Sequence, residues 1–187
     1  MGSSFSKLKS KFSKKKEARI LMVGIDGAGK TTIFNRIKIG KLVETIPTMG
    51  FDIETLDYKG LSLILWDIGG QDKIRVLWKR FYENTDGIIF VVDSADRDLI
   101  EDAAEELKKL LAEEELKDCH VLVMANKQDL NNALPPKEIT EKLGMEQLKG
   151  NTWLVQGTSA VTGEGINEGL DWMASLFSKK NKRNKIN

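Results

Sequence analysis

The sequence predicts an α/β fold in one domain: a six-stranded, mostly parallel sheet with helices on both faces and one antiparallel edge strand. From Ala18 onward, short apolar runs alternate with segments of helical period, as in doubly wound sheets. Four of these runs are almost continuously apolar, which is typical of strands covered on both faces. The length of 187 residues suits a single well-filled core.

The expected elements follow one another in a regular order. Six runs are predicted to be strands, at 18–24, 51–58, 61–67, 87–94, 120–126 and 152–157. Helical patterns occupy about 30–39, 72–84, 98–116, 136–143 and 164–177. In the third of these, Ala103, Leu107, Leu110 and Leu111 share one face, so that this face should cover the sheet.

The segment FDIETLDY at 51–58 differs from the other strand candidates because its apolar and polar residues alternate. Such alternation indicates a strand with one face in water, at an edge of the sheet. The pair Lys59-Gly60 follows directly and is predicted to close a hairpin with the strand at 61–67.

Composition excludes several classes of protein. No apolar run approaches the roughly 20 residues needed to cross a bilayer. The single cysteine, Cys119, excludes an intramolecular disulfide and a cysteine-rich metal site, and it fits a reducing compartment.

The net charge of +1 conceals a separation of charge along the chain. Residues 1–16 hold six basic residues and residues 179–187 hold five, without any acid, which leaves 18 basic against all 28 acidic residues in between. An acidic body argues against binding to nucleic acid. Basic ends favour an anionic membrane surface as the partner.

The loop after the first strand, Gly24-Ile25-Asp26-Gly27-Ala28-Gly29-Lys30-Thr31, matches G-x-x-x-x-G-K-[ST] between a strand and a helix. Its backbone N–H groups and the positive helix end would surround phosphate oxygens, and Lys30 would reach the terminal phosphates. The Thr31 hydroxyl would be a ligand of Mg²⁺. The predicted nucleotide-binding residues here are Gly24, Asp26, Gly27, Ala28, Gly29, Lys30, Thr31 and Thr32. The alternative is a plain glycine-rich turn.

The run Asn126-Lys127-Gln128-Asp129 after the fifth strand indicates which base is bound, because N-K-x-D resembles the guanine-specificity loop of small GTPases. Asp129 can accept hydrogen bonds from the guanine N1–H and amine together, whereas adenine would leave that carboxylate unpaired. Asn126 would brace the loop, and the Lys127 stem would cover the base plane. Ser159 and Ala160 fit the second base loop, with the Ala160 N–H facing guanine O6.

Two further segments carry residues for the γ-phosphate. Asp67 begins a D-x-x-G element and would hold Mg²⁺ through water, while the Gly70 N–H would meet the γ-phosphate. Gln71 follows and is placed to orient an attacking water. Upstream, Thr48 would be the second Mg²⁺ ligand, engaged only when the γ-phosphate draws its loop inward.

Four motifs make the resemblance specific: P-T-x-G-F, W-D-x-G-G-Q-D-K-I-R, N-K-Q-D and G-L-D-W. Together they are similar to the ADP-ribosylation factor (Arf) family of small GTPases, from Gly2 to about Phe177. The resemblance implies a P-loop small-GTPase domain preceded by an N-terminal amphipathic helix. It also implies that the hairpin shifts by two residues when GTP replaces GDP, carrying an apolar effector patch of Phe51, Trp66 and Phe81.

The resemblance implies a monomeric GTP switch with GTP or GDP and Mg²⁺ as ligands. Its partners would be an exchange factor, an activating protein, and effector or coat proteins, with no nucleic acid. No arginine lies between Ile39 and Gly50, so we expect slow intrinsic hydrolysis that needs the activating protein's arginine. With Lys30 and Gly70, Gln71 makes up the expected catalytic set. The alternatives are a P-loop kinase or ATPase, an Arf-like paralogue outside trafficking, and a nucleotide-locked scaffold.

The first residues, M-G-S-S-F-S, match the N-myristoylation pattern at Gly2. One acyl chain binds membranes only marginally, and Phe5, Leu8 and Phe12 could add one stripe of a short helix among lysines. In Arf relatives this helix docks on the GDP-bound body and is released with GTP. We therefore expect a leader (1–16), a GTPase domain (17–178) and a basic tail (179–187). The expected location is the cytoplasm, reversibly on Golgi or other secretory-pathway membranes.

Overall fold

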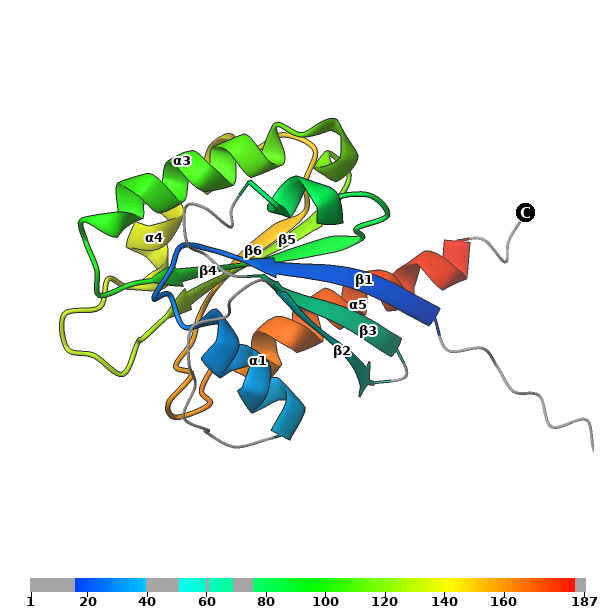
Figure 1. Ribbon diagram of the computed structural model, residues 1–187, viewed down its shortest axis with the longest axis horizontal. Coiled ribbons are helices and arrows are strands. Elements are labelled where there is room, and N and C mark those ends of the chain that lie inside the picture. Colours follow the sequence, from blue (N-terminus) through cyan, green and yellow to red (C-terminus); the bar gives the residue numbers. More distant parts are fainter. Residues whose placement is uncertain (1–15, 40–50, 60, 69–75, 184–187) are drawn as a thin grey trace, which may run out of the picture.

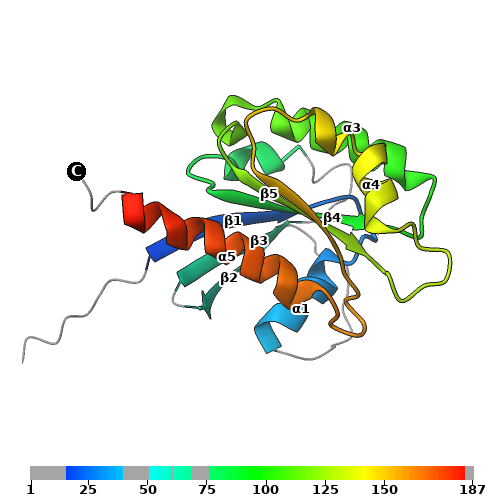
Figure 2. The same ribbon diagram turned by 180° about the vertical axis from the view of Figure 1, so that it is seen from behind.

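A six-stranded sheet in the order β2-β3-β1-β4-β5-β6 forms the centre of the protein, with helices on both of its faces (Figures 1 and 2). The computed structural model describes residues 16–39, 51–59, 61–68 and 76–183. The strands are β1 (Lys16–Val23), β2 (Phe51–Tyr58), β3 (Leu61–Ile68), β4 (Gly87–Asp93), β5 (His120–Asn126) and β6 (Trp153–Gly157). In the described ranges the α-helices are α1 (Lys30–Ile39), α3 (Leu99–Leu111), α4 (Pro136–Lys142) and α5 (Ile166–Arg183). Short 3₁₀ helices are η1 (Trp78–Phe81), η2 (Glu114–Leu116) and η3 (Met145–Gln147).

The pairing of the strands confirms the predicted fold class. β1 pairs in parallel with both β3 and β4, and β5 pairs in parallel with β4 and β6. Only β2 among these strands runs antiparallel to its neighbour, β3. Because Tyr58 is opposite Leu61, the hairpin loop has two residues, and Lys59 has the left-handed φ of 47° that tight hairpin turns require.

The edge position expected of 51–58 is also confirmed. On one face of β2, Ile53 is 40% exposed and Thr55 is exposed. On the other face, Leu56 and Tyr58 are half-buried against the core below α1 and α5. One wet face and one covered face explain the alternation of the sequence in this strand.

Two apolar layers hold the helices to the sheet. On one side, α3 buries Ala103, Leu107 and Leu110, with Leu111 half-buried beside them, as the sequence predicts. On the other side, α1 and α5 bury residues that include Ile33, Phe34, Leu170, Met173 and Phe177. Figures 1 and 2 show α3 and α4 on one face and α1 and α5 on the other. None of the helices in the described ranges has the length and apolar character that a bilayer crossing requires.

The helix predicted at 72–84 is wrong in the part that the structure describes, from residue 76 on. The chain there forms only the 3₁₀ helix η1. With three residues per turn, this places Trp78 and Phe81 on one face, and both are buried. After this turn, the Thr85 hydroxyl donates to the Phe81 carbonyl at 2.8 Å. The preceding residue, Asn84, has a left-handed φ of 59°, so the helical conformation does not continue.

Two other helices differ in length from the prediction. The pattern at 98–116 divides into α3 and η2 because Glu113 has an extended backbone, with φ −74° and ψ 132°. At the C-terminal end, α5 runs on to Arg183, beyond the predicted end at 177.

Candidate functional site

The expected nucleotide-binding loops lie at one edge of the sheet, because each follows the carboxyl end of a parallel strand. The phosphate loop follows β1, and the base loops follow β5 and β6. β1 stands between β3 and β4, so the chain after β1 leads to the strands on one side of it and the chain after β3 leads to the strands on the other. Such a switch point opens a crevice for a ligand.

The glycines of the phosphate loop are required by close packing. A Cβ on Gly24 would lie 2.3 Å from the carbonyl oxygen of Val91 on β4, and the φ of Gly24 is 150°. A Cβ on Gly29 would lie 2.4 Å from Nδ2 of Asn126, with a φ of 92°. Real Cβ atoms essentially never approach so closely, so the loop can pass this near to Val91 and Asn126 only with glycine at both positions.

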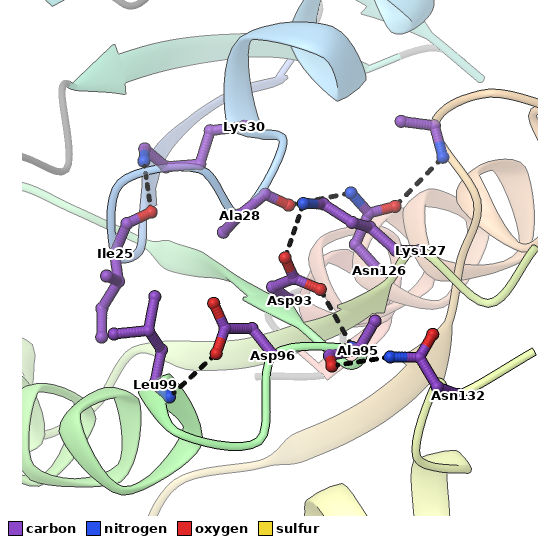
Figure 3. A network of polar contacts seen from close by, with 11 residues as sticks. Ile25, Ala28, Lys30, Asp93, Ala95, Asp96, Leu99, Asn126, Lys127 and Asn132 are labelled. Carbon is purple, nitrogen blue, oxygen red and sulfur yellow. Dashed lines mark hydrogen bonds and ion pairs between the residues drawn. The ribbon is translucent and has the colours of Figure 1, made fainter. Parts of the chain in front are cut away.

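Lys30 closes the phosphate loop on itself. Its Nζ donates to the carbonyl oxygen of Ile25 at 3.0 Å, and the residue is only 5% exposed (Figure 3). The ammonium is therefore held beside the loop at the start of α1, where terminal phosphates would enter. Thr31 and Thr32 follow in the first turn of α1 and are half-buried.

Asn126, at the end of β5, joins three segments. Its Nδ2 donates to the carbonyl oxygen of Ala28 at 2.9 Å, and its Oδ1 accepts from the Ala160 N–H at 3.0 Å. The Thr158 hydroxyl lies 3.4 Å from the same Oδ1. The side chain is 1% exposed, so these are buried bonds (Figure 3). Asn126 thus braces its own loop, as expected, and also joins it to the phosphate loop and to the second base loop.

Two hydrogen bonds in sequence fix the orientation of the Asp129 carboxylate. Its Oδ1 accepts from the Ser159 hydroxyl at 2.6 Å, and the Thr162 N–H donates to that hydroxyl oxygen at 3.1 Å. Ser159 is 1% exposed, whereas Asp129 is exposed. The carboxylate is therefore oriented from behind while it faces solvent, where it can accept the donors of a guanine edge. The Ala160 N–H donates to Asn126, so its bond to guanine O6 stays a prediction.

Lys127 has a partner that sequence reasoning missed. Its Nζ donates to Oδ2 of Asp93 at 2.5 Å, and their side chains are 34% and 15% exposed (Figure 3). Asp93 is the last residue of β4 and is opposite Asn126 in the pairing with β5. The signal available in the sequence was an acidic residue at the end of an otherwise apolar strand.

Trp66 of the expected effector patch is half-buried. The Arg19 guanidinium lies over its ring, 4.4 Å from the centroid, and the Phe81 ring centroid is 5.0 Å away. Phe81 is 8% exposed and belongs to the core. It therefore packs against Trp66 from the interior and does not form an exposed part of a patch in this structure. Contact of either ring with an effector stays a prediction.

Several predicted residues lie outside the described part of the chain: Gly2, Thr48, Gly70 and Gln71, with the side chains of Phe51 and Asp67. Within that part, no group of three or more His, Cys, Asp and Glu side chains could hold a metal ion. Thr31 follows Lys30 in the first turn of α1, and its hydroxyl is a hard oxygen donor of the kind that Mg²⁺ takes together with substrate phosphates. The described residues therefore fit a Mg²⁺–nucleotide complex.

Comparison with known proteins points the same way. A model of the ADP-ribosylation factor family matches residues 3–177. Among solved structures, the chain is similar to the Arl6 BBS3 small GTPase from Trypanosoma brucei, a structure with the bound nucleotide analogue GppNp. The two share 29% sequence identity with a TM-score of 0.80, and the match covers 88% of this chain and 99% of that one.

Proposed function

The chain belongs to the ADP-ribosylation factor family of small GTPases, and from this premise we propose that it binds membranes when loaded with GTP and recruits effectors there in vesicle trafficking. Its family makes it a GTP-binding switch and a GTP hydrolase that takes GTP or GDP with Mg²⁺. Exchange factors, activating proteins and effectors are the general partners of such a switch.

The observation that carries the membrane proposal is the combination of the first 16 residues with an acidic body. Gly2 takes the myristoyl chain, and the apolar stripe of Phe5, Leu8 and Phe12 with six surrounding lysines supplies the second signal that stable binding needs. Each lysine near an anionic leaflet adds about 1 kcal/mol. Since the stripe is thin, binding depends strongly on salt. The protein then resides in the cytoplasm and reversibly on Golgi or other secretory-pathway membranes.

The chemistry assigns one task to each residue. Thr31, Thr48 and, through water, Asp67 would hold Mg²⁺, which would supply positive charge to offset that of the phosphate oxygens. The ammonium of Lys30 and the N–H of Gly70 hold the γ-phosphate. Gln71 orients a water that attacks the γ-phosphorus, whose bond to the GDP oxygen breaks. An arginine of the activating protein stabilises the transition state, because the loop before Gly50 contains none.

A second candidate is an Arf-like role outside trafficking, favoured by the similarity to an Arl6 protein over 88% of the chain. Both candidates share the nucleotide cycle and differ in the membrane and effectors used. Identification of the proteins that bind the GppNp form and not the GDP form separates them: coat proteins support the trafficking role, and their absence among specific partners supports the second.

The membrane proposal is tested by vesicle flotation of myristoylated protein loaded with GDP or GppNp. We expect the GppNp form to float with vesicles that contain anionic lipid and to be released by salt. The matched control, Gly2→Ala, should not float in either state. The proposal would be contradicted if both nucleotide forms floated equally, or if vesicle binding did not depend on salt concentration and on anionic lipid.

A further inference from the structure

We propose that Asp93 is a positioning residue for the nucleotide base: it holds the ammonium of Lys127, so that the methylene stem of this lysine lies ready along the face of the base. The inference rests on guanine-nucleotide binding at this site. It concerns the residues that prepare the site before the base arrives, and Asp93 itself touches neither base nor phosphate.

Lys127 is held at both ends of its side chain. At one end, Nζ donates to Oδ2 of Asp93 at 2.5 Å. At the other, the backbone has a left-handed φ of 68°, and the Lys127 carbonyl accepts from the Leu130 N–H at 3.0 Å. The stem between these points therefore has little freedom, although the side chain is 34% exposed.

Asp93 is itself fixed. Its second oxygen, Oδ1, accepts from the Ala95 N–H at 2.9 Å, so that both carboxylate oxygens are bound. Ser94, the next residue, is bonded to the segment that contains the base loop. Its N–H donates to the Asn126 carbonyl at 3.0 Å, and its carbonyl accepts from the Leu134 N–H at 2.8 Å.

Figure 3 shows the resulting arrangement. Lys127 extends from the end of β5 toward the carboxylate of Asp93 on β4. Ala28 of the phosphate loop lies nearby. Beyond Asp93, Asn132, in the segment between the base loop and α4, donates through Nδ2 to the Ala95 carbonyl at 3.1 Å. The carboxylate is thus part of the framework of the site, while the lysine stem is the part that faces the ligand.

A lysine without such a partner samples many rotamers, and a flat base that packs on its stem must order it on binding. With the ammonium held in advance, this entropic cost is met during folding, and bound nucleotide leaves more slowly. Loss of the anchor should therefore raise the rate of nucleotide release about fivefold to thirtyfold.

The test measures release of a fluorescent GDP derivative from the full chain in excess unlabelled GDP. Asp93→Asn keeps the bond from the Ala95 N–H and weakens the bond to Lys127, and we expect it to release GDP about fivefold to thirtyfold faster. The matched control is Asp98→Asn, which removes the same charge from an exposed residue at the start of α3 whose side chain makes no cap bond. It should stay within about twofold of the unaltered protein.

A double-mutant cycle separates positioning from a purely structural role. Lys127→Met removes the ammonium and keeps an apolar stem, so Asp93→Asn should add less than about twofold in that background. The preference for GDP over inosine diphosphate should not change, because the stem meets the base face and not its edge. Full additivity, or a loss of this preference in Asp93→Asn, would overturn the proposal.

If Asp93→Asn does not fold, Lys127→Met and Lys127→Arg test the same bond on a partly exposed side chain, with faster release expected for Lys127→Met alone. Equal release by both would overturn the proposal. Failure of the unaltered protein to bind GDP would refute the function itself, whereas normal binding with no effect of Asp93→Asn would refute only the positioning role.

Discussion

The side-chain amide of Asn126 donates to the carbonyl oxygen of Ala28 at 2.9 Å, so a residue at the end of β5 closes a loop that begins after β1. The two residues are 98 positions apart in the chain. Since the same side chain accepts from the Ala160 N–H, one buried amide fixes the distance between the phosphate loop and the base loops. The phosphate loop and the base loops are therefore joined through one side chain.

Asn126→Asp tests this coupling with an isosteric change. A carboxylate would face the Ala28 carbonyl and lose the donated bond in a buried position. We expect GDP release to become about 30-fold faster or more, with a lower Tm of the GDP-bound protein. The matched control is Asn132→Asp, where the amide donates to the Ala95 carbonyl at an exposed position. Equal effects of the two substitutions would contradict the bracing role.

Gly24→Ala tests the close approach of the phosphate loop to β4. The added Cβ would lie 2.3 Å from the Val91 carbonyl oxygen, so β4 or the loop must move. Gly150→Ala is the control, because Gly150 also has a positive φ, 104°, but has open space around it. We expect Gly24→Ala to lose about 1–3 kcal/mol more unfolding free energy than the control. Denaturant unfolding with saturating GDP measures this, and equal losses would show that the contact is unimportant.

Asp171 on α5 links the hairpin to the helix, and this link should depend on pH. The Lys59 ammonium pairs with its carboxylate and the Tyr58 hydroxyl donates to it at 2.5 Å, which together hold the pKa of Asp171 below its usual value. Desolvation and the bond to Asp171 raise the pKa of Tyr58 in turn. A depressed carboxylate pKa stabilises the fold at pH values above the unfolded pKa, about 3.9, and the benefit disappears as the pH falls through the folded pKa.

The measurement compares the Tm of the unaltered protein and of Asp171→Asn across pH. The unaltered protein should be the more stable at neutral pH, and the difference should shrink toward zero below about pH 4. Because the carboxylate is exposed, high salt should also reduce the difference. Asp118→Asn, at an exposed position in the loop before β5, serves as the control. A difference that is constant from neutral to acid pH would contradict an ionic origin.

Gln71→Leu should abolish stimulated hydrolysis while leaving nucleotide binding intact. The unaltered protein is expected to hydrolyse GTP at about 10⁻⁴ to 10⁻³ s⁻¹ or below without a partner. With an activating protein of the Arf class, single-turnover hydrolysis by Gln71→Leu should be slower than that of the unaltered protein by about 100-fold or more. GppNp affinity is the control and should not change. Rapid hydrolysis by the purified chain alone would contradict the prediction that catalysis needs an arginine from the activating protein.

Local patterns were sufficient for most of the fold. The strands at 51–58 and 120–126 and the helix at 30–39 have the predicted limits, because periodicity and the flanking turns are properties of neighbouring residues. The 3₁₀ helix at Trp78–Phe81 was predicted as a longer helix. Its length depends on burial of Trp78 and Phe81 against distant segments and on the bond from Thr85, which helical periodicity does not reveal.

The amino-acid sequence by itself determined the order of strands and helices, the phosphate loop and the N-K-Q-D element, because each is a short contiguous pattern with its own chemistry. Only the tertiary structure decided which groups bind these elements together: the Asp93 carboxylate for Lys127, the Ser159 hydroxyl for Asp129 and the Ala28 carbonyl for Asn126. These partners are 30 to 98 residues apart. They meet because β1, β4, β5 and β6 lie side by side in register, and that pairing is a property of the whole sheet.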